Sequence, residues 1–172
     1  MKQDNRGYSL VELIVIIAIV GILAGLSMVS IASVPQGQVK ACTKELVYQL
    51  EHTRTNSLGY EGASLTLTMD ADGVHTKCSV TKKGVTTDET KTVGKAGIEI
   101  YYKIDGGALT LLEDDALTLT YDRSSGAFKY PKLTVGGSES TLDKYCTDII
   151  IKKGSYQRQI SLIPLTGKLV QK

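Results

Sequence analysis

The sequence contains no tryptophan, one phenylalanine and three prolines among its 172 residues, and its net charge is only +2. This near-neutral balance gives no general attraction to nucleic acid or to acidic partners. The only histidines, His52 and His75, belong to no recognisable nucleophile motif, and no zinc-site spacing of cysteines and histidines occurs. The segment Asp70–Gly73 lacks the glutamate that closes a calcium loop. We therefore expect no enzyme activity, no metal and no cofactor.

Charge is also absent from Leu13 to Val34, a run broken only by small polar residues. As a helix, this run would be about 33 Å long, which matches a bilayer core of about 30 Å. Lys2 and Arg6 precede the run, so the positive-inside tendency leaves the N-terminus in the cytoplasm and the chain after Val34 outside. One carboxylate, that of Glu12, stands directly before the run, although burying it in lipid is costly.

Three interpretations fit this N-terminus. A secretory signal peptide would be cut after the run, at the small residues 30–33, and a plain signal anchor would stay uncut. Neither interpretation gives Glu12 a role. In the third, a leader is cut before the run, which leaves the apolar helix in place with a new amine close to Glu12.

The stretch RGYSLVELIVIIAIVGILA resembles the class III leader junction of type IV prepilins and type II secretion pseudopilins. Gly7 corresponds to the residue before the cut, Tyr8 to the first mature residue, and Glu12 to the glutamate that follows it in this family. The resemblance implies cleavage between Gly7 and Tyr8 by a prepilin peptidase, methylation of the new amine, and a role of Glu12 in assembly. The implied partners are other pilins or pseudopilins, an inner-membrane platform protein and an assembly ATPase. The implied location is the cytoplasmic membrane, with the C-terminal domain outside, and then a pilus or pseudopilus.

After the run, Pro35 and Gly37 predict a kink or a short break. A second helical stretch, to about residue 58, carries one apolar stripe made of Val39, Cys42, Leu46, Leu50 and Thr53. The chain thus divides into a leader (1–7), a transmembrane half of a long helix (8–34), an amphipathic half (35–59) and a β-rich globular domain (60–172).

The globular domain is expected to consist of short antiparallel strands. Alternating apolar residues between turn residues mark strands at 64–70, 74–82, 98–104, 116–122, 127–135, 146–153 and 157–165. Residues 82–97 are polar and rich in Thr and Lys, so we predict a long exposed loop there. The expected fold class is α+β and pilin-like: a long N-terminal helix followed by a small antiparallel β-sandwich.

A narrower resemblance, to H-type minor pseudopilins and FimT-like minor pilins, covers residues 46–67, 119–128 and 158–170. Thr166, Gly167 and Lys168 match the C-terminal hairpin of that group, and Arg54 fits its helix end loosely. From its own stretch alone, Arg54 is more readily interpreted as an ordinary solvated helix residue.

Two further hypotheses concern the globular domain. Cys78 and Cys146 are the first choice for a disulfide, Cys42 is an alternative partner of either, and three free buried thiols are the remaining possibility. The basic residues Lys152, Lys153, Arg158, Lys168 and Lys172 form either a patch for DNA phosphates or an ordinary charged hairpin. The first reading suits a competence-type minor pilin, and a membrane-anchored extracytoplasmic binding domain is a further alternative.

Overall fold

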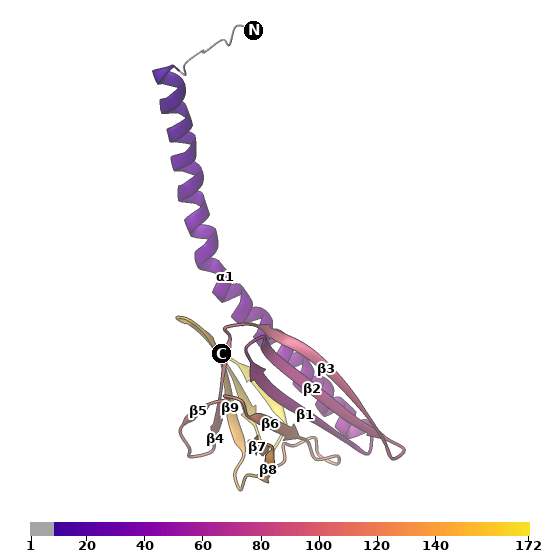
Figure 1. The fold of residues 1–172 in the computed structure, drawn as a ribbon. Helices are drawn as coiled ribbons and strands as arrows, with labels where there is room; N and C mark the ends of the chain where they lie inside the picture. The colour runs from indigo at the N-terminus through magenta and orange to yellow at the C-terminus, as the bar shows by residue number, and fades with distance from the viewer. Residues whose placement is uncertain (1–8) are drawn as a thin grey trace. The chain divides into compact units, whose positions relative to one another are not determined.

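The structure is a computed structural model in which residues 9–172 are described, apart from the side chains of residues 25–33. It contains a single long helix, α1 (Leu10–Gly59), followed by eleven β-strands in the described part of the chain (Figure 1). Between Val34 and Pro35 the chain divides into two compact units. The strands all belong to the second unit, together with the C-terminal half of α1.

The first unit holds the N-terminal half of α1. The large apolar side chains from Leu10 to Leu23 are each about half exposed or more. Among the described residues, no helix combines the length and the apolarity that crossing a membrane requires. The predicted span, residues 8–34, includes Tyr8 and residues 25–33, which fall outside that description.

Helix α1 contains Pro35 and Gly37 without interruption, so of the two predicted alternatives, a kink or a short break, the break does not occur. A proline inside a helix costs roughly 3 kcal/mol because it removes one backbone hydrogen bond and crowds the preceding turn. Beyond Pro35, however, the helix buries a whole face, and each fully buried Val or Leu contributes about 1.5–3 kcal/mol. Packing within the second unit therefore outweighs the local preference of the sequence.

The strands form two antiparallel sheets. The first, sheet A, has the order β3-β2-β1-β6-β7-β8, with strands β1 (Gly62–Asp70), β2 (Gly73–Lys82), β3 (Val85–Lys95), β6 (Ala116–Thr120), β7 (Lys132–Val135) and β8 (Ser138–Thr141). The second, sheet B, has the order β11-β10-β9-β4-β5, with strands β4 (Glu99–Ile104), β5 (Leu109–Leu111), β9 (Cys146–Lys153), β10 (Tyr156–Ile163) and β11 (Lys168–Gln171). Each paired strand runs antiparallel to its neighbours, as predicted.

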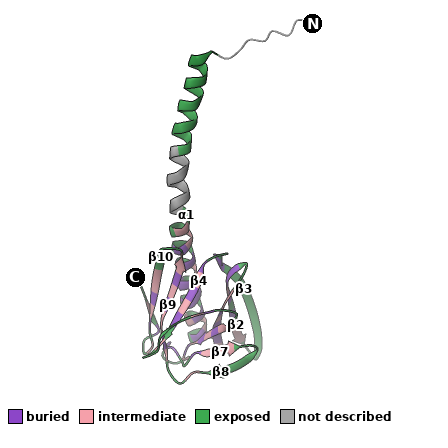
Figure 2. Cartoon of the chain, turned by 60° about the vertical axis from the view of Figure 1, so that its left-hand side comes forward, coloured by how far each residue is buried: buried purple, intermediate pink, exposed green. Residues whose placement is uncertain are grey.

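One core joins the two sheets and the C-terminal half of α1. The predicted helix stripe is confirmed, because Val39, Cys42, Leu46, Leu50 and Thr53 are each at most 2 % exposed. The strands of both sheets add alternate residues to this core, and purple, buried positions recur along them in Figure 2. The expected pilin-like α+β fold, a helix packed against antiparallel sheets, is thus confirmed.

The predicted loop at residues 82–97 is wrong, because most of it is strand β3. Lys83 and Gly84 have φ angles of 48° and 76°, which make the tight two-residue turn that joins β2 to β3. From Val85 to Thr92 every side chain of β3 is exposed (Figure 2). The alternation that marks a half-buried strand is therefore absent from this stretch, which is why its sequence resembles a loop.

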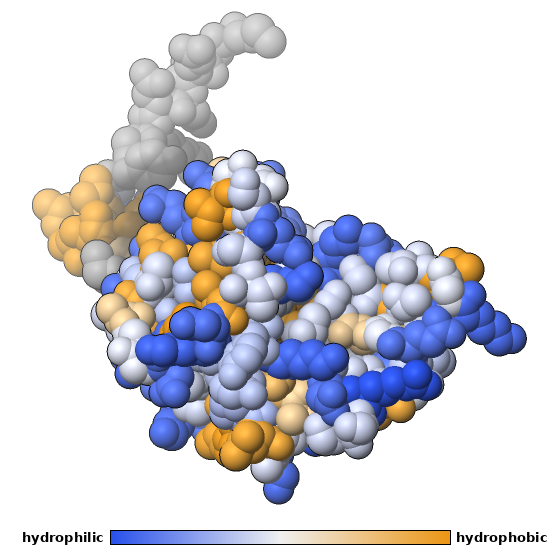
Figure 3. Space-filling model, turned by 90° about the horizontal axis from the view of Figure 1, so that it is seen from below, coloured by the Kyte–Doolittle hydropathy of each residue, from blue (hydrophilic) through white to orange (hydrophobic). Residues whose placement is uncertain are grey.

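The surface of the globular domain is largely polar. On the face shown in Figure 3, blue and white side chains predominate, and the apolar side chains over the β-domain form small, separate patches. Small patches of this kind are normal for a protein surface and do not by themselves mark a binding site.

Candidate functional site

The residues of the predicted leader junction lie at the start of the chain. Gly7 and Tyr8 are outside the described residues. Glu12 lies in the first turn of α1 with an exposed side chain, and its backbone N–H donates to Oγ of Ser9 at 3.2 Å. Ser9 thus caps the helix, and the helix dipole favours a carboxylate in the first turn. The Glu12 carboxylate is therefore presented at a helix N-terminus.

A second cluster, the Arg54 joint, consists of Arg54, Gly126, Thr166 and Gly167. Nε of Arg54 donates to the carbonyl oxygen of Gly126 at 3.0 Å, and Nη2 donates to the carbonyl oxygen of Thr166 at 2.8 Å. Arg54 belongs to the end of α1, Gly126 to the turn after β6, and Thr166 to the turn between β10 and β11. One guanidinium therefore ties the helix to a turn of each sheet.

The Arg54 joint brings together the three segments that carry the narrower resemblance. Arg54 is half-buried and donates to two carbonyl oxygens, so it is not an ordinary solvated helix residue. Sequence patterns predicted that the segments form a helix end and two turns, but they did not predict that these contact one another. Hydrogen bonds between a side chain and distant backbone carbonyls leave no periodic signal in a sequence.

The joint requires glycine at two positions. Gly167 has a φ angle of +64°, and a Cβ atom there would lie 1.8 Å from the carbonyl oxygen of Gly126 and 2.8 Å from Nε of Arg54. Gly126 has a φ angle of +68°, and its Cβ atom would lie 3.0 Å from the same Nε. Both the backbone conformation and the available space therefore exclude a side chain at Gly167.

The turn that presents Gly126 is organised by Asp122. The Asp122 carboxylate accepts hydrogen bonds from the hydroxyl groups of Ser124 (2.5 Å) and Ser125 (3.0 Å) and from their backbone N–H groups (3.0 and 3.1 Å). These bonds, led by the Ser124 hydroxyl, lower the pKa of Asp122 to about 2. The ionised carboxylate thus holds the turn in the shape that brings the Gly126 carbonyl to Arg54.

Tyr121 adds a second set of contacts between α1 and sheet A. Its hydroxyl donates to the carbonyl oxygen of Leu50 at 3.0 Å, and the hydroxyl of Ser57 donates to the carbonyl oxygen of Tyr121 at 3.1 Å. Burial raises the pKa of Tyr121, so the phenol remains a neutral donor. Alternation in the sequence placed Tyr121 on the inner face of its strand, but it gave no sign of these partners.

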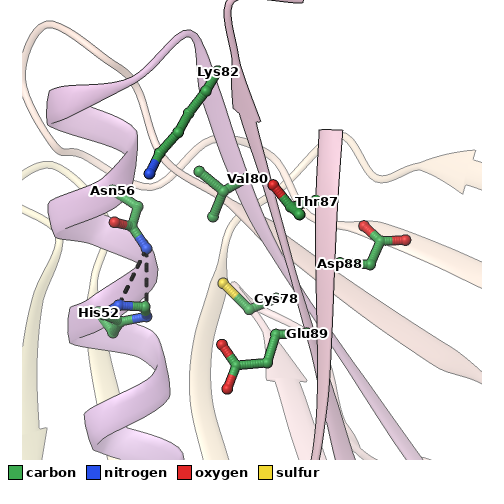
Figure 4. A pocket seen from close by; sticks show the side chains of 8 residues that line it. All are labelled: His52, Asn56, Cys78, Val80, Lys82, Thr87, Asp88 and Glu89. Atoms are coloured by element: carbon green, nitrogen blue, oxygen red, sulfur yellow. Dashed lines mark hydrogen bonds between the residues drawn. The ribbon is translucent and has the colours of Figure 1, made fainter. Parts of the chain in front are cut away.

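A small pocket of about 260 Å³ lies between α1 and the β2–β3 hairpin, and is lined by His52, Asn56, Cys78, Val80, Lys82, Thr87, Asp88 and Glu89 (Figure 4). His52 contacts Asn56 at 3.4 Å, whereas Cys78 lies 3.4 Å from the hydroxyl of Thr53. Among the described residues, no hydrogen bond joins His52 to Cys78. The part of the chain that the structure describes also contains no group of His, Cys, Asp and Glu arranged for a metal ion.

The predicted disulfide between Cys78 and Cys146 is not formed, because both residues and Cys42 are free and buried. Cys78 lies on β2 of sheet A, whereas Cys146 lies on β9 of sheet B, with its Sγ 3.7 Å from the carbonyl oxygen of Asp148. Burial raises the pKa of Cys42 and of Cys146 to about 12, so these thiols are poor nucleophiles. The structure thus has three free, buried thiols, which was the remaining possibility.

The basic residues near the C-terminus do not share one face of sheet B. Arg158 lies opposite the buried Ile151 in the register, whereas Lys168 lies opposite the exposed Ile163. Because successive side chains of a strand alternate between faces, Arg158 is on the inner side and Lys168 on the outer side. Lys172 pairs through its backbone with Gln159 and lies on the same side as Lys168.

Comparison with known families gives one result. Residues 2–28 match the family model described as the prokaryotic N-terminal methylation motif. No curated protein and no solved structure matches the chain significantly.

The match means that the chain carries a class III prepilin leader, as the leader junction predicted. This leader implies processing by a prepilin peptidase, membrane insertion and assembly with other pilins. Together with the pilin-like α+β fold, this leader is consistent with a structural role as a pilin or pseudopilin subunit.

The glycine requirement of the Arg54 joint can be tested with two matched substitutions. Gly167→Ala places a methyl group against the Gly126 carbonyl, so we expect it to lower the free energy of unfolding by about 2–4 kcal/mol, from strain and loss of the Arg54 contacts. Gly136→Ala is the control, because Gly136 also has a positive φ (56°) but no atom within 4 Å of the added Cβ. Denaturant unfolding that gives equal losses for the two variants would contradict the steric argument.

The role of Asp122 predicts a pH dependence of stability. Because the pKa is lowered in the folded state, the contribution of Asp122 is complete above its unfolded pKa of about 3.9 and is lost as the pH falls toward about 2. The stability difference between the wild type and Asp122→Ala should therefore be constant at neutral pH and shrink from pH 4 to pH 2. Thermal unfolding across this range measures it, and a difference that grows on acidification would refute the assignment.

Proposed function

We propose that the chain is a minor pilin or pseudopilin, a structural subunit of a type IV pilus or a type II secretion filament. The observation that carries the proposal is the prepilin-type methylation motif at residues 2–28, directly continued by a helix whose second half is built into a β-domain. Such a chain can enter a filament by its N-terminal helix while its folded domain stays on the outside. The narrower likeness to H-type and FimT-like subunits favours a minor subunit.

Processing in this proposal occurs between Gly7 and Tyr8, and the new amine of Tyr8 is methylated. Glu12 then has a cationic partner. Two unit charges about 4 Å apart attract by about 4 kcal/mol at an effective dielectric constant of 20. Insertion scales put a carboxylate at the bilayer centre at a cost of about 2.5–3.5 kcal/mol, and less near the interface. The attraction is thus large enough to offset the penalty.

The pairing between Glu12 and an amine can occur within one helix or between two subunits. Tyr8 and Glu12 are four positions apart, a spacing at which side groups meet on a helix. In a bundle of staggered helices, Glu12 of an incoming subunit meets the Tyr8 amine of a subunit already in place. We favour the second arrangement, because it makes the charge pair a condition for subunit addition in the correct register.

Filament extension also accounts for the other proposed partners, a platform protein in the inner membrane and an assembly ATPase. Until assembly, the chain is anchored by residues 8–34 with residues 60–172 outside the cytoplasmic membrane. A plain membrane-anchored binding domain differs in two observables. It would keep residues 1–7, and it would be absent from filaments sheared off the cell.

The variant Glu12→Ala tests the proposal. We expect the native protein to begin at a methylated Tyr8, as read by the mass of its N-terminal peptide, and Glu12→Ala to be cut equally. Incorporation of the variant into sheared filaments should fall at least tenfold, consistent with a loss of more than about 1.4 kcal/mol. Glu12→Gln is the matched control for side-chain shape and should fail in the same way. Normal incorporation of either variant would refute the assembly role, and an uncut N-terminus would refute the whole proposal.

A competence-type minor pilin that binds DNA is the second candidate. Three basic residues, Lys152, Lys168 and Lys172, lie on the outer face of sheet B, whereas Arg158 does not share that face. This geometry supports at most a small number of phosphate contacts, so binding should be weak and strongly dependent on salt.

The DNA hypothesis is tested by titrating the protein with labelled duplex at 20–50 mM and 200 mM salt. If the hypothesis holds, binding appears at low salt, Lys168→Ala with Lys172→Ala abolishes it, and Arg158→Ala changes it little. No binding at low salt would eliminate this candidate.

A further inference from the structure

Strand β3 is the outermost strand of sheet A and pairs only with β2. It runs from Val85 to Lys95 and is the longest strand among the described residues. Its side chains from Val85 to Thr92 are all exposed, and they colour the strand green in Figure 2. A long, exposed edge strand offers unpaired backbone groups to another strand.

The backbone groups that face the open edge can be identified. The carbonyl oxygen of Thr81 accepts a bond from the N–H of Glu61, so the backbone of Thr81 faces away from β3. Its partner in the register, Thr86, must then direct its own N–H and C=O away from β2. Alternate residues share this direction, so the free backbone groups at the edge belong to Thr86, Asp88, Thr90 and Thr92.

The charges of β3 restrict which strand can pair there. Asp88 is already neutralised by Lys77 at 2.7 Å, and Lys91 contacts Glu45 of α1 at 2.6 Å. Glu89 has no ion pair among the described residues, and its side chain is exposed. The edge therefore carries one unpaired carboxylate two positions from a lysine.

We propose that β3 pairs with β3 of a second copy of this chain, antiparallel and with a two-fold axis at Thr90. In this register Thr90 faces Thr90, Asp88 faces Thr92, and Glu89 faces Lys91 twice, once on each side of the axis. The hydrogen-bonded positions fall on the residues whose backbone groups are free. The Glu89 and Lys91 side chains meet at the non-hydrogen-bonded positions, where opposed side chains are closest.

The neighbouring symmetric registers are excluded by charge. Moving the axis to Glu89 opposes two glutamates, moving it to Asp88 opposes two aspartates, and moving it to Lys91 opposes two lysines. Like charges directly across a sheet are destabilising. Charged edges usually prevent pairing between copies. Of these four registers, only the one with its axis at Thr90 opposes no like charges.

The symmetry also determines which copies can meet. Along α1, Cys42 lies beside Gly94, Glu45 contacts Lys91, and the later residues His52 and Asn56 line a pocket with Thr87. The helix therefore runs antiparallel to β3. A two-fold axis perpendicular to the sheet makes α1 of the second copy run in the opposite direction to α1 of the first. Two subunits of one polar filament cannot form this contact, whereas two copies presented from opposite directions can. That the contact would join filaments running in opposite directions rests on the proposed function, but the contact between two copies does not.

Cysteine substitution in the purified full-length chain in detergent tests the contact. Thr90→Cys places two thiols on the axis at a Cα separation of about 5.5 Å, which is within the range of about 4.4–6.8 Å for a disulfide. Thr86→Cys is the matched control, because Thr86 is exposed on the same edge but would lie many residues from its symmetry mate. The native cysteines are buried, so they give no background. We expect dimer on mild oxidation to form at least about tenfold faster for Thr90→Cys than for Thr86→Cys.

The register is tested by charge reversal in the Thr90→Cys chain. Glu89→Lys alone opposes lysines twice, so cross-linking should fall several-fold. Mixing this chain with one that carries Lys91→Glu restores both opposite-charge pairs, so the mixed dimer should form faster than either homodimer.

The proposal is overturned if Thr86→Cys cross-links as fast as Thr90→Cys, or if Glu89→Lys has no effect. It is also overturned if Thr90→Cys stays monomeric. Adding Glu12→Ala to the Thr90→Cys chain separates this proposal from the filament function, because cross-linking in detergent should remain unchanged.

Discussion

The fold depends on one constraint: the C-terminal half of α1 has an apolar face that only the β-domain can cover. Leu46 and Leu50 are fully buried, and Thr53 and Ser57 continue the same face to the end of the helix. Side chains at spacings of three and four reach residues of both sheets, so neither sheet is complete without the helix. This dependence explains why α1 tolerates Pro35, because the burial that follows the proline exceeds its local cost.

Burial alone leaves a helix free to slide or rotate by small amounts, and polar contacts fix its position. The Arg54 guanidinium reaches one turn from each sheet, and Tyr121 and Ser57 exchange contacts with the backbone of the opposite element. Each of these bonds ends on a backbone carbonyl, whose position is set by the surrounding backbone and not by a single side chain. Such bonds specify one register of helix and sheets, whereas apolar packing tolerates several.

Sequence patterns predicted the elements that obey a period. The helix stripe and the inner faces of β1, β2, β4, β6, β9 and β10 show alternation at the helix or strand spacing, and the structure confirms them. The patterns failed where burial does not impose a period, as in β3, whose two faces are both exposed. They also failed for Arg54, because its hydrogen bonds reach residues far away in the sequence. At Pro35 they failed because burial of the helix face outweighs the local tendency of proline to break a helix. The disulfide prediction failed because strand membership says nothing of which sheet a cysteine joins.

The two halves of α1 therefore obey different physical rules within one continuous helix. From Val39 onward one face of the helix is selected by the core, and a change on that face alters the stability of the folded domain. From Leu10 to Leu23 no side chain contributes to that core, and the apolar residues remain exposed. The first half of the helix is thus free to be selected for contacts outside the chain, with other subunits or with lipid. A substitution such as Glu12→Ala acts on those contacts without disturbing the fold, so its effects can be assigned to assembly.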